Sequence, residues 1–208
     1  MRKFLLLSLL LAAPLASRAA DDNKMLYVEY RLTGEQVAPG SFDSLVKKVW
    51  RVGDRMLRFE DAPNPQTKMH GLIVVSEPDI WVVDRSTNEG QHTVDPGPDL
   101  KVRFPIFASE KSSRLAELEF GSELTFFRGY DARELAPAVV DGVRCRLLNL
   151  PDVDERDLTL YLKPDDTPLQ IVLKTKDYEY AVRFLRYEPD HQLNRSLFHP
   201  PPEAKIKG

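Results

Sequence analysis

The chain has 208 residues, with 29 Lys and Arg against 32 Asp and Glu, a formal net charge of −3 and one cysteine. This length is typical of a single domain with one hydrophobic core. The acidic balance argues against a protein that binds nucleic acid or anionic membranes, because such proteins usually carry an excess of Lys and Arg. A single cysteine excludes a disulfide within the chain, so the core has to hold the fold together.

The first residues have the pattern of a secretory signal. Arg2 and Lys3 precede an apolar run over 4–13, and small residues follow it. The run is about half as long as the roughly 20 residues that a membrane-spanning helix needs. We predict cleavage after Ala19, which leaves residues 20–208 as one soluble, periplasmic domain.

Apolar and polar residues alternate along several short segments, as in half-buried antiparallel strands. The clearest are 26–32, 158–162, 169–173 and 178–184. Less regular segments of the same kind are 45–52, 56–60, 71–75, 80–84, 124–128 and 143–150. Turn-forming residues such as Asp141-Gly142 separate them, which predicts hairpins in sequence and a meander.

One segment, 109–120, has helical spacing, with Leu115 and Leu118 on one side. Ser109 can cap its start and Gly121 its end. Its apolar side is thin, so we expect a cover over the sheet that can lift. Together these patterns predict an α+β fold that is mostly antiparallel β, with one helix against a curved sheet.

Residues that could carry catalysis are scattered. The sequence has four histidines, and no two of them stand at a metal-ligand spacing. It contains no nucleophile elbow and no phosphate-binding loop. The acidic segment 152–157 lacks the ordered ligands of a calcium loop, and 95–99 is a Pro-rich turn. Cys145 alternates with Val143 and Leu147, so we expect a buried structural thiol. We predict a protein that is not an enzyme and that uses no cofactor or metal.

Three segments together resemble the periplasmic outer-membrane lipoprotein carriers, the LolA-like family. The first is Val46-Lys-Lys-Val-Trp-Arg-Val-Gly-Asp-Arg-Met-Leu-Arg-Phe59 with the strands 71–75 and 79–83 after it. The second is the hairpin Leu162-Lys-Pro-Asp-Asp-Thr-Pro-Leu-Gln-Ile171, and the third is Leu197-Phe-His-Pro-Pro-Pro-Glu-Ala-Lys-Ile206. They occur in the family's order over most of the chain.

The resemblance implies an incomplete (half) β-barrel with a helical lid and an apolar cavity for the acyl chains of a lipoprotein or a related lipid. It also implies a functional arginine, for which Arg55 and Arg58 are both candidates. A curved sheet with a single helix can leave apolar wall residues uncovered, and apolar hollows of this kind bind lipids. The ligand-lining residues that we predict are Trp50, Leu57, Phe59, Ile73, Trp81, Phe126, Leu160, Ile171, Val182 and Phe184.

The function predicted from the sequence is therefore a monomeric carrier of a hydrophobic ligand in outer-membrane lipoprotein sorting, with lipid or lipoprotein acyl chains as partners. The alternative is an envelope adaptor whose barrel is filled by its own side chains and which binds a partner protein through a charged face or a strand edge. An open cavity favours the carrier, and a filled barrel favours the adaptor. Neither function involves nucleic acid.

The signal-peptide prediction has a direct test. Protein recovered from the periplasm should have an intact mass that corresponds to a start at Ala20, because the apolar run and small residues favour cleavage after Ala19. A mass that still includes residues 1–19 would contradict export through this signal.

Overall fold

The computed structural model describes residues 23–95, 105–107 and 113–207. The predicted signal segment, Ser109 and residues 96–99 of the Pro-rich turn lie outside these ranges. In the described part no helix is long and apolar enough to cross a membrane.

Twelve strands form one sheet, and short helices interrupt them. The strands are β1 (Lys24–Gly34), β2 (Lys47–Val52), β3 (Met56–Glu60), β4 (Gly71–Ser76), β5 (Asp79–Asp84), β6 (Glu89–Val94), β7 (Arg133–Val140), β8 (Val143–Val153), β9 (Arg156–Leu162), β10 (Pro168–Lys174), β11 (Glu179–Gln192) and β12 (Lys205–Lys207). The helices are α1 (Glu123–Gly129) and the short 3-10 helices η1 (Phe42–Ser44), η2 (Arg114–Glu117) and η3 (Arg195–Phe198).

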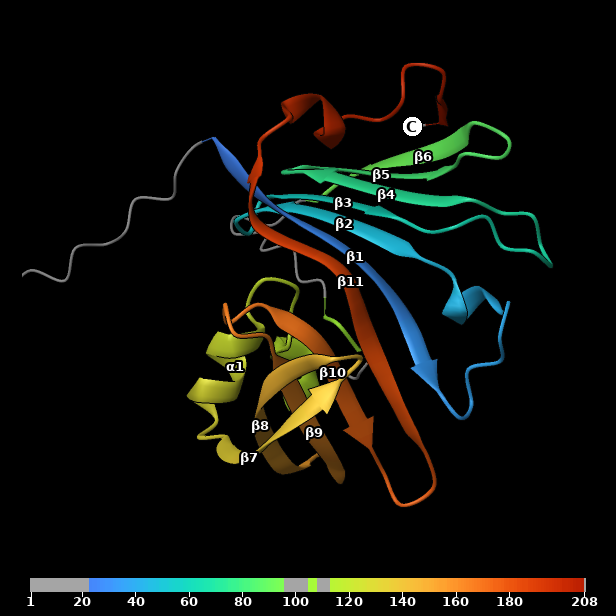
Figure 1. Ribbon diagram of the computed structural model, residues 1–208. Coiled ribbons are helices and arrows are strands. Elements are labelled where there is room, and N and C mark those ends of the chain that lie inside the picture. The colour runs from blue at the N-terminus through green and yellow to red at the C-terminus, as the bar shows by residue number, and fades with distance from the viewer. Residues whose placement is uncertain (1–22, 96–104, 108–112, 208) are drawn as a thin grey trace, which may run out of the picture.

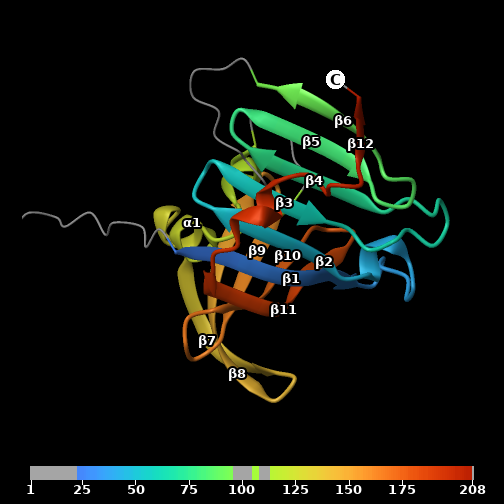
Figure 2. The same cartoon turned by 90° about the horizontal axis from the view of Figure 1, so that it is seen from above.

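The strand order is β12-β6-β5-β4-β3-β2-β1-β11-β10-β9-β8-β7, and the sheet is open at β12 and β7. All neighbours are antiparallel except β12 and β6. The predicted meander is therefore two meanders, β1–β6 and β7–β11, which the pairing of β1 with β11 joins. Figure 1 shows β2–β6 above this long pair, with β8–β10 and α1 below it. Figure 2 shows β7 and β8 extending away from β6 and β12, at the opposite end of the sheet.

The alternating segments lie in strands, as expected, but some strands are buried on both faces, as Tyr27 and Val28 of β1 show. In β9, Leu158, Leu160 and Leu162 are fully buried, while the residues between them are not. We call the face that carries these leucines the inner face. Cys145 lies on the opposite, outer face and is a buried free thiol packed with Leu147, which confirms that prediction.

The helix predicted over 109–120 was wrong in position, because the α-helix lies at 123–129. In the described part of 109–120 only η2 is helical, and Ser113 caps it by accepting from the backbone N–H of Leu115. The α-helix α1 occupies 123–129 instead, where a strand was predicted over 124–128. Glu123, Phe126 and Phe127 are buried at a spacing of three and four residues, which suits a helix and breaks strand alternation.

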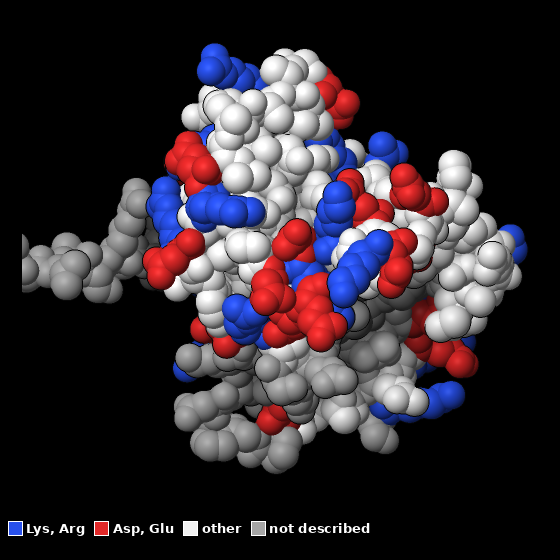
Figure 3. All heavy atoms as spheres, turned by 90° about the horizontal axis from the view of Figure 1, so that it is seen from below, with Lys and Arg blue, Asp and Glu red and all other residues white. Residues whose placement is uncertain are grey.

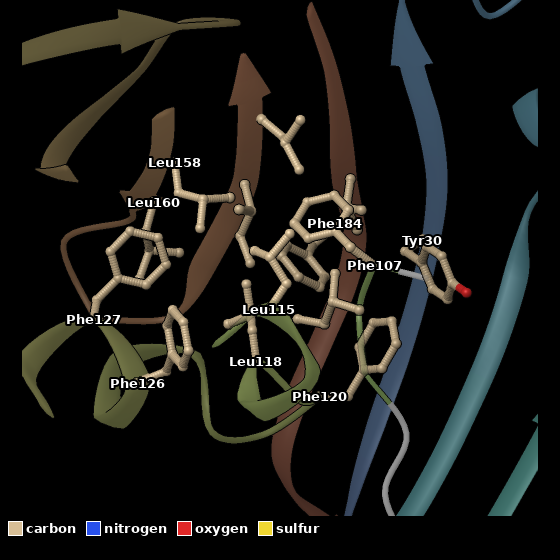
Figure 4. Close-up of a cluster of buried hydrophobic side chains, with 14 of the residues drawn as sticks. Tyr30, Phe107, Leu115, Leu118, Phe120, Phe126, Phe127, Leu158, Leu160 and Phe184 are labelled. Carbon is tan, nitrogen blue, oxygen red and sulfur yellow. The ribbon is translucent and has the colours of Figure 1, made fainter. Parts of the chain in front are cut away.

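The main core lies between the inner face and the segment 113–130, which contains η2 and α1 and which we call the cover. Leu115, Leu118 and Phe120 of the cover are buried against strands β8–β11 and β1. Figure 4 shows these side chains together with Phe126, Phe127, Leu158, Leu160 and Phe184. On this half of the sheet the inner face is filled by the chain's own side chains.

The C-terminal segment 194–207 crosses the outer face of β3–β6. Phe198 is buried, and the backbone carbonyl of Leu197 accepts a hydrogen bond from Arg58 at 3.2 Å. Ile206 of β12 packs against an outer-face cluster of Leu72, Val74 and Val83. The chain itself therefore covers the outer face of this half of the sheet.

Core packing predicts a clear difference between two apolar truncations. Leu160→Ala should lower the free energy of unfolding by about 2–5 kcal/mol, because Leu160 is fully buried and its loss leaves a cavity. Val139→Ala is the control, since Val139 is 69% exposed and should cost at most about 0.5 kcal/mol. Urea unfolding measures both, and equal losses would contradict the assignment of the core.

Candidate ligand-binding face

Strand register places the inner-face residues of β1–β6 in rows that run across the sheet. One row is Val28, Val49, Phe59, Ile73, Val82 and Gln91. The next row is Leu26, Arg51, Leu57, Val75, Ile80 and Thr93. Rows on one face lie about 7 Å apart, because the side chains of a strand repeat every two residues.

Burial decreases along these rows, from the filled half of the sheet toward its edge at β6. Val49 is fully buried, Phe59 and Ile73 are half-buried, and Val82 is 52% exposed. Ile80 in the neighbouring row is also half-buried. We call Phe59, Ile73, Ile80 and Val82 the inner strip. It is a continuous apolar surface, since Ile73 pairs directly with both Phe59 and Val82.

The ten predicted lining residues fall into three groups. Six lie in the buried core, namely Leu57, Phe126, Leu160, Ile171, Val182 and Phe184. Phe59 and Ile73 pack against that core and belong to the inner strip. Trp50 and Trp81 lie on the outer face, Trp50 stacked on Tyr27 and Trp81 on His92. The two tryptophans therefore lie on the opposite side of the sheet from the inner strip and cannot line a site there.

Ile80 and Val82 of the inner strip were missed in the sequence. The signal was present, because both alternate with Trp81 in the segment 80–84. The choice of Trp81 as a lining residue excluded its two neighbours, since adjacent residues of a strand point to opposite faces. Register with Ile73 would have decided between them, but register is not visible in a single sequence.

A polar network ties the cover to the sheet. The guanidinium of Arg51 on β2 forms an ion pair with Glu119 at 2.5 Å and donates to the backbone carbonyl of Phe120 at 3.0 Å. Gly121, with φ +91°, lies against β1, where an added Cβ would come within 2.9 Å of Leu26 Cδ2. The cover thus follows the sheet closely at 119–121.

Glu123, at the start of α1, continues this network from the other side. Its carboxylate accepts from the hydroxyl of Tyr187 on β11 at 2.6 Å and from the backbone N–H of Gly121 at 3.0 and 3.1 Å. Full burial raises the pKa of Glu123 to about 7, although these hydrogen bonds and the charge of Arg51 act in the opposite direction. Burial and the adjacent carboxylate raise the pKa of Tyr187.

Of the two arginines named from the resemblance, neither reaches the cover. Arg55 lies in the β2–β3 turn and is largely exposed, with Glu77 as its ion-pair partner at 3.6 Å. Arg58 is buried on the outer face, where it pairs with Glu60 and bonds to Leu197. Arg51 of β2 does reach the cover, and from the cover itself Arg114 donates to the backbone carbonyl of Asp152 on β8 at 2.5 Å.

The other polar groups of interest are the acidic segment 152–157 and the hollow next to it. Among the described residues no three His, Cys, Asp or Glu side chains could hold a metal ion. Asp154 of the acidic segment accepts from Ser113 Oγ at 2.6 Å and so anchors η2. A polar hollow of about 520 Å³ lies beside it among the hairpin turns, lined by both signs of charge from Asp152 to Arg156 and from Thr175 to Tyr178. Figure 3 likewise shows acidic and basic side chains interspersed on one face of the molecule.

The fold is thus an open antiparallel sheet whose inner face is covered on one half and partly exposed on the other. No family model and no curated protein matches the sequence. Among solved structures the chain is similar to an uncharacterized conserved protein from Thermus thermophilus, with a TM-score of 0.51 and 13% identity over 89% of this chain and 90% of that one. This likeness supports the fold.

LolA-superfamily proteins are also among the structures to which the chain is similar. For NE2245 from Nitrosomonas europaea the TM-score is 0.34 at 12% identity, over 86% of this chain and 90% of that one. The MucA/MucB complex of Pseudomonas aeruginosa gives 0.48 at 12% identity, over 88% of this chain and 58% of that one.

The burial of Glu123 predicts a pH-dependent stability. Its folded-state pKa of about 7 lies above the ordinary value of 4.5, so the folded state binds the extra proton between these two pH values. The free energy of unfolding should therefore fall as pH rises from 4.5 to 7, by at most about 3 kcal/mol from this group. Glu123→Gln, which keeps the acceptor for Tyr187, should flatten this part of the profile.

Urea unfolding at several pH values between 4.5 and 8 measures the effect. Glu203→Gln is the control, because Glu203 is an exposed carboxylate near the C-terminus, away from the cover. A Glu123→Gln profile parallel to that of the wild type would contradict the assignment.

Proposed function

We propose that the protein is an exported periplasmic carrier that holds the acyl chain of a lipid or lipoprotein on the inner strip, in an incomplete barrel closed on one side by the cover. The observation that carries the proposal is the half-exposed apolar row Phe59, Ile73 and Val82, which continues directly from a fully buried core. A ligand that covers these apolar side chains removes them from water, which lowers the free energy of the complex.

The magnitudes favour an acyl chain as ligand. Each buried methylene contributes about 0.8 kcal/mol, so a few carbons laid on the strip are enough for measurable affinity. No charged group of the described residues lies within the strip itself, which suits an apolar chain. The resemblance of the sequence to lipoprotein carriers points to the same ligand class.

The chain also has a feature that favours the adaptor alternative. The half of the inner face under the cover is filled, and β7 is an edge strand with exposed apolar side chains at Leu135 and Val139. Edge strands with unpaired backbone groups can accept a strand from a partner protein. On this hypothesis the partner binds at β7 and the inner strip stays without ligand.

The carrier proposal predicts a selective effect of Val82→Asp. A carboxylate in the strip would have to be desolvated by the bound chain, so the affinity for a fluorescent acyl probe should fall at least about tenfold. Val82 is half-exposed, so the folded state should tolerate the change. Leu185→Asp is the matched control, because Leu185 is 46% exposed on β11 and lies outside the strip, and its affinity should stay within about twofold of the wild type.

Thermal unfolding of both variants checks that the fold is intact. Native mass spectrometry of the protein purified gently from the envelope should also find part of it occupied by an acylated molecule. Only bare protein, together with no uptake of the probe by the folded wild type, would reject the carrier and favour the adaptor.

A further inference from the structure

The inner face carries a third row, which is polar and borders the strip. Tyr30 on β1 is directly opposite Lys47 on β2. The β2–β3 ladder ends at Lys48 and Glu60, so Lys47 and Asp61 occupy the next positions in the same register. Asp61 in turn bonds through its backbone N–H to the carbonyl of Gly71 at 3.0 Å.

This polar row lies about 7 Å from the strip row that contains Phe59 and Ile73, since each strand advances by two residues between rows. Gly71 keeps the space in front of Asp61 free of a side chain. An added Cβ at Gly71 would come within 3.0 Å of Asp61 Oδ2. The carboxylate of Asp61 therefore lies over Gly71, in the place that a side chain from this position of β4 would occupy.

The two charged groups of the row differ in how well they are satisfied. The Lys47 ammonium is buried, donates to the backbone carbonyl of Phe42 at 2.9 Å and lies 4.4 Å from the centre of the Phe42 ring. Asp61 Oδ1, in contrast, is buried and has no hydrogen-bond partner among the described residues. Burial raises the pKa of Asp61, while the nearby Lys47 and His70 act in the opposite direction.

A buried acceptor without a donor is unfavourable, and a ligand that supplies the donor removes that cost. From the unpaired Asp61 Oδ1 beside the apolar strip we infer a head-group subsite, formed by Asp61 with Lys47 and Tyr30, for an acyl ligand whose head donates a hydrogen bond through a hydroxyl or an N–H group. The inference rests on the proposed function and specifies its ligand. An anionic head is disfavoured at Asp61, because it would bring like charges together.

The test compares three ligands with the same acyl chain and different heads, in competition with a fluorescent acyl probe for the exported protein. These are 1-monooleoylglycerol with hydroxyl donors, methyl oleate without a donor, and oleate with an anionic head. The wild type should bind 1-monooleoylglycerol about tenfold more tightly than methyl oleate, since the hydroxyl satisfies Asp61. Asp61→Ala should remove this preference and leave the affinity for methyl oleate unchanged.

The control is Asp190→Ala, which removes an exposed carboxylate that pairs with Lys24 at 3.3 Å and should keep the preference. Equal binding of 1-monooleoylglycerol and methyl oleate by the wild type would overturn the subsite while the carrier function stands. Tighter binding of oleate would also overturn it, because Lys47 would then be the recognising group.

Two further outcomes bear on the inference. Equal loss of both neutral ligands in a folded Asp61→Ala protein would show a purely structural role and reject the subsite. Failure of the wild type to bind any of the three would reject the proposed function itself, and the subsite with it.

Discussion

The pairing of β1 with β11 is the constraint on which the rest of the structure depends. It runs from Lys24 opposite Gln192 to Gly34 opposite Tyr180 and joins the two meanders into one sheet. Gly34 has φ +139°, and an added Cβ there would come within 2.6 Å of the carbonyl oxygen of Glu179, so the pair needs glycine at this end. Because both meanders share this pair, their inner faces are continuous and a single cover can contact both.

Local patterns predicted nine of the twelve strands, missed β6, β7 and β12, and did not predict how the two meanders are joined. Alternation in β9 and β10 gave the right face for Leu158, Leu160 and Ile171, because side chains of a strand alternate regardless of what it pairs with. The β1–β11 pair joins residues more than 140 positions apart, and no local pattern carries that information. The same limit explains the site, since Phe59 and Ile73 were chosen as apolar residues of predicted strands and the placement of Val82 beside them depends on register.

The misplaced helix has a different physical origin. Leu115 and Leu118 have helical spacing, yet only one turn of 3-10 helix forms there, because tertiary contacts bury each of them in an extended cover. Weak helical periodicity in a short segment is easily overridden by packing. The adjacent Phe126 and Phe127 were the stronger signal, since two neighbouring buried aromatics do not fit a half-buried strand.

The polar network under the cover separates the filled and the open halves of the inner face. Arg51 holds the cover from β2 and Tyr187 holds it from β11, so the cover spans β1 and is fixed from both sides. Burying these groups costs desolvation free energy. Because each group of the network is paired, the network fixes a single arrangement of the cover on the sheet. Val49 on β2 is fully buried and its partner Phe59 on β3 is half-buried, so the exposed apolar surface of the inner face begins beyond β2. If the protein binds an acyl chain as we propose, a chain that extended from the strip under the cover would meet the ion pair of Arg51 with Glu119, so the contact that fixes the cover would also limit the length of chain held.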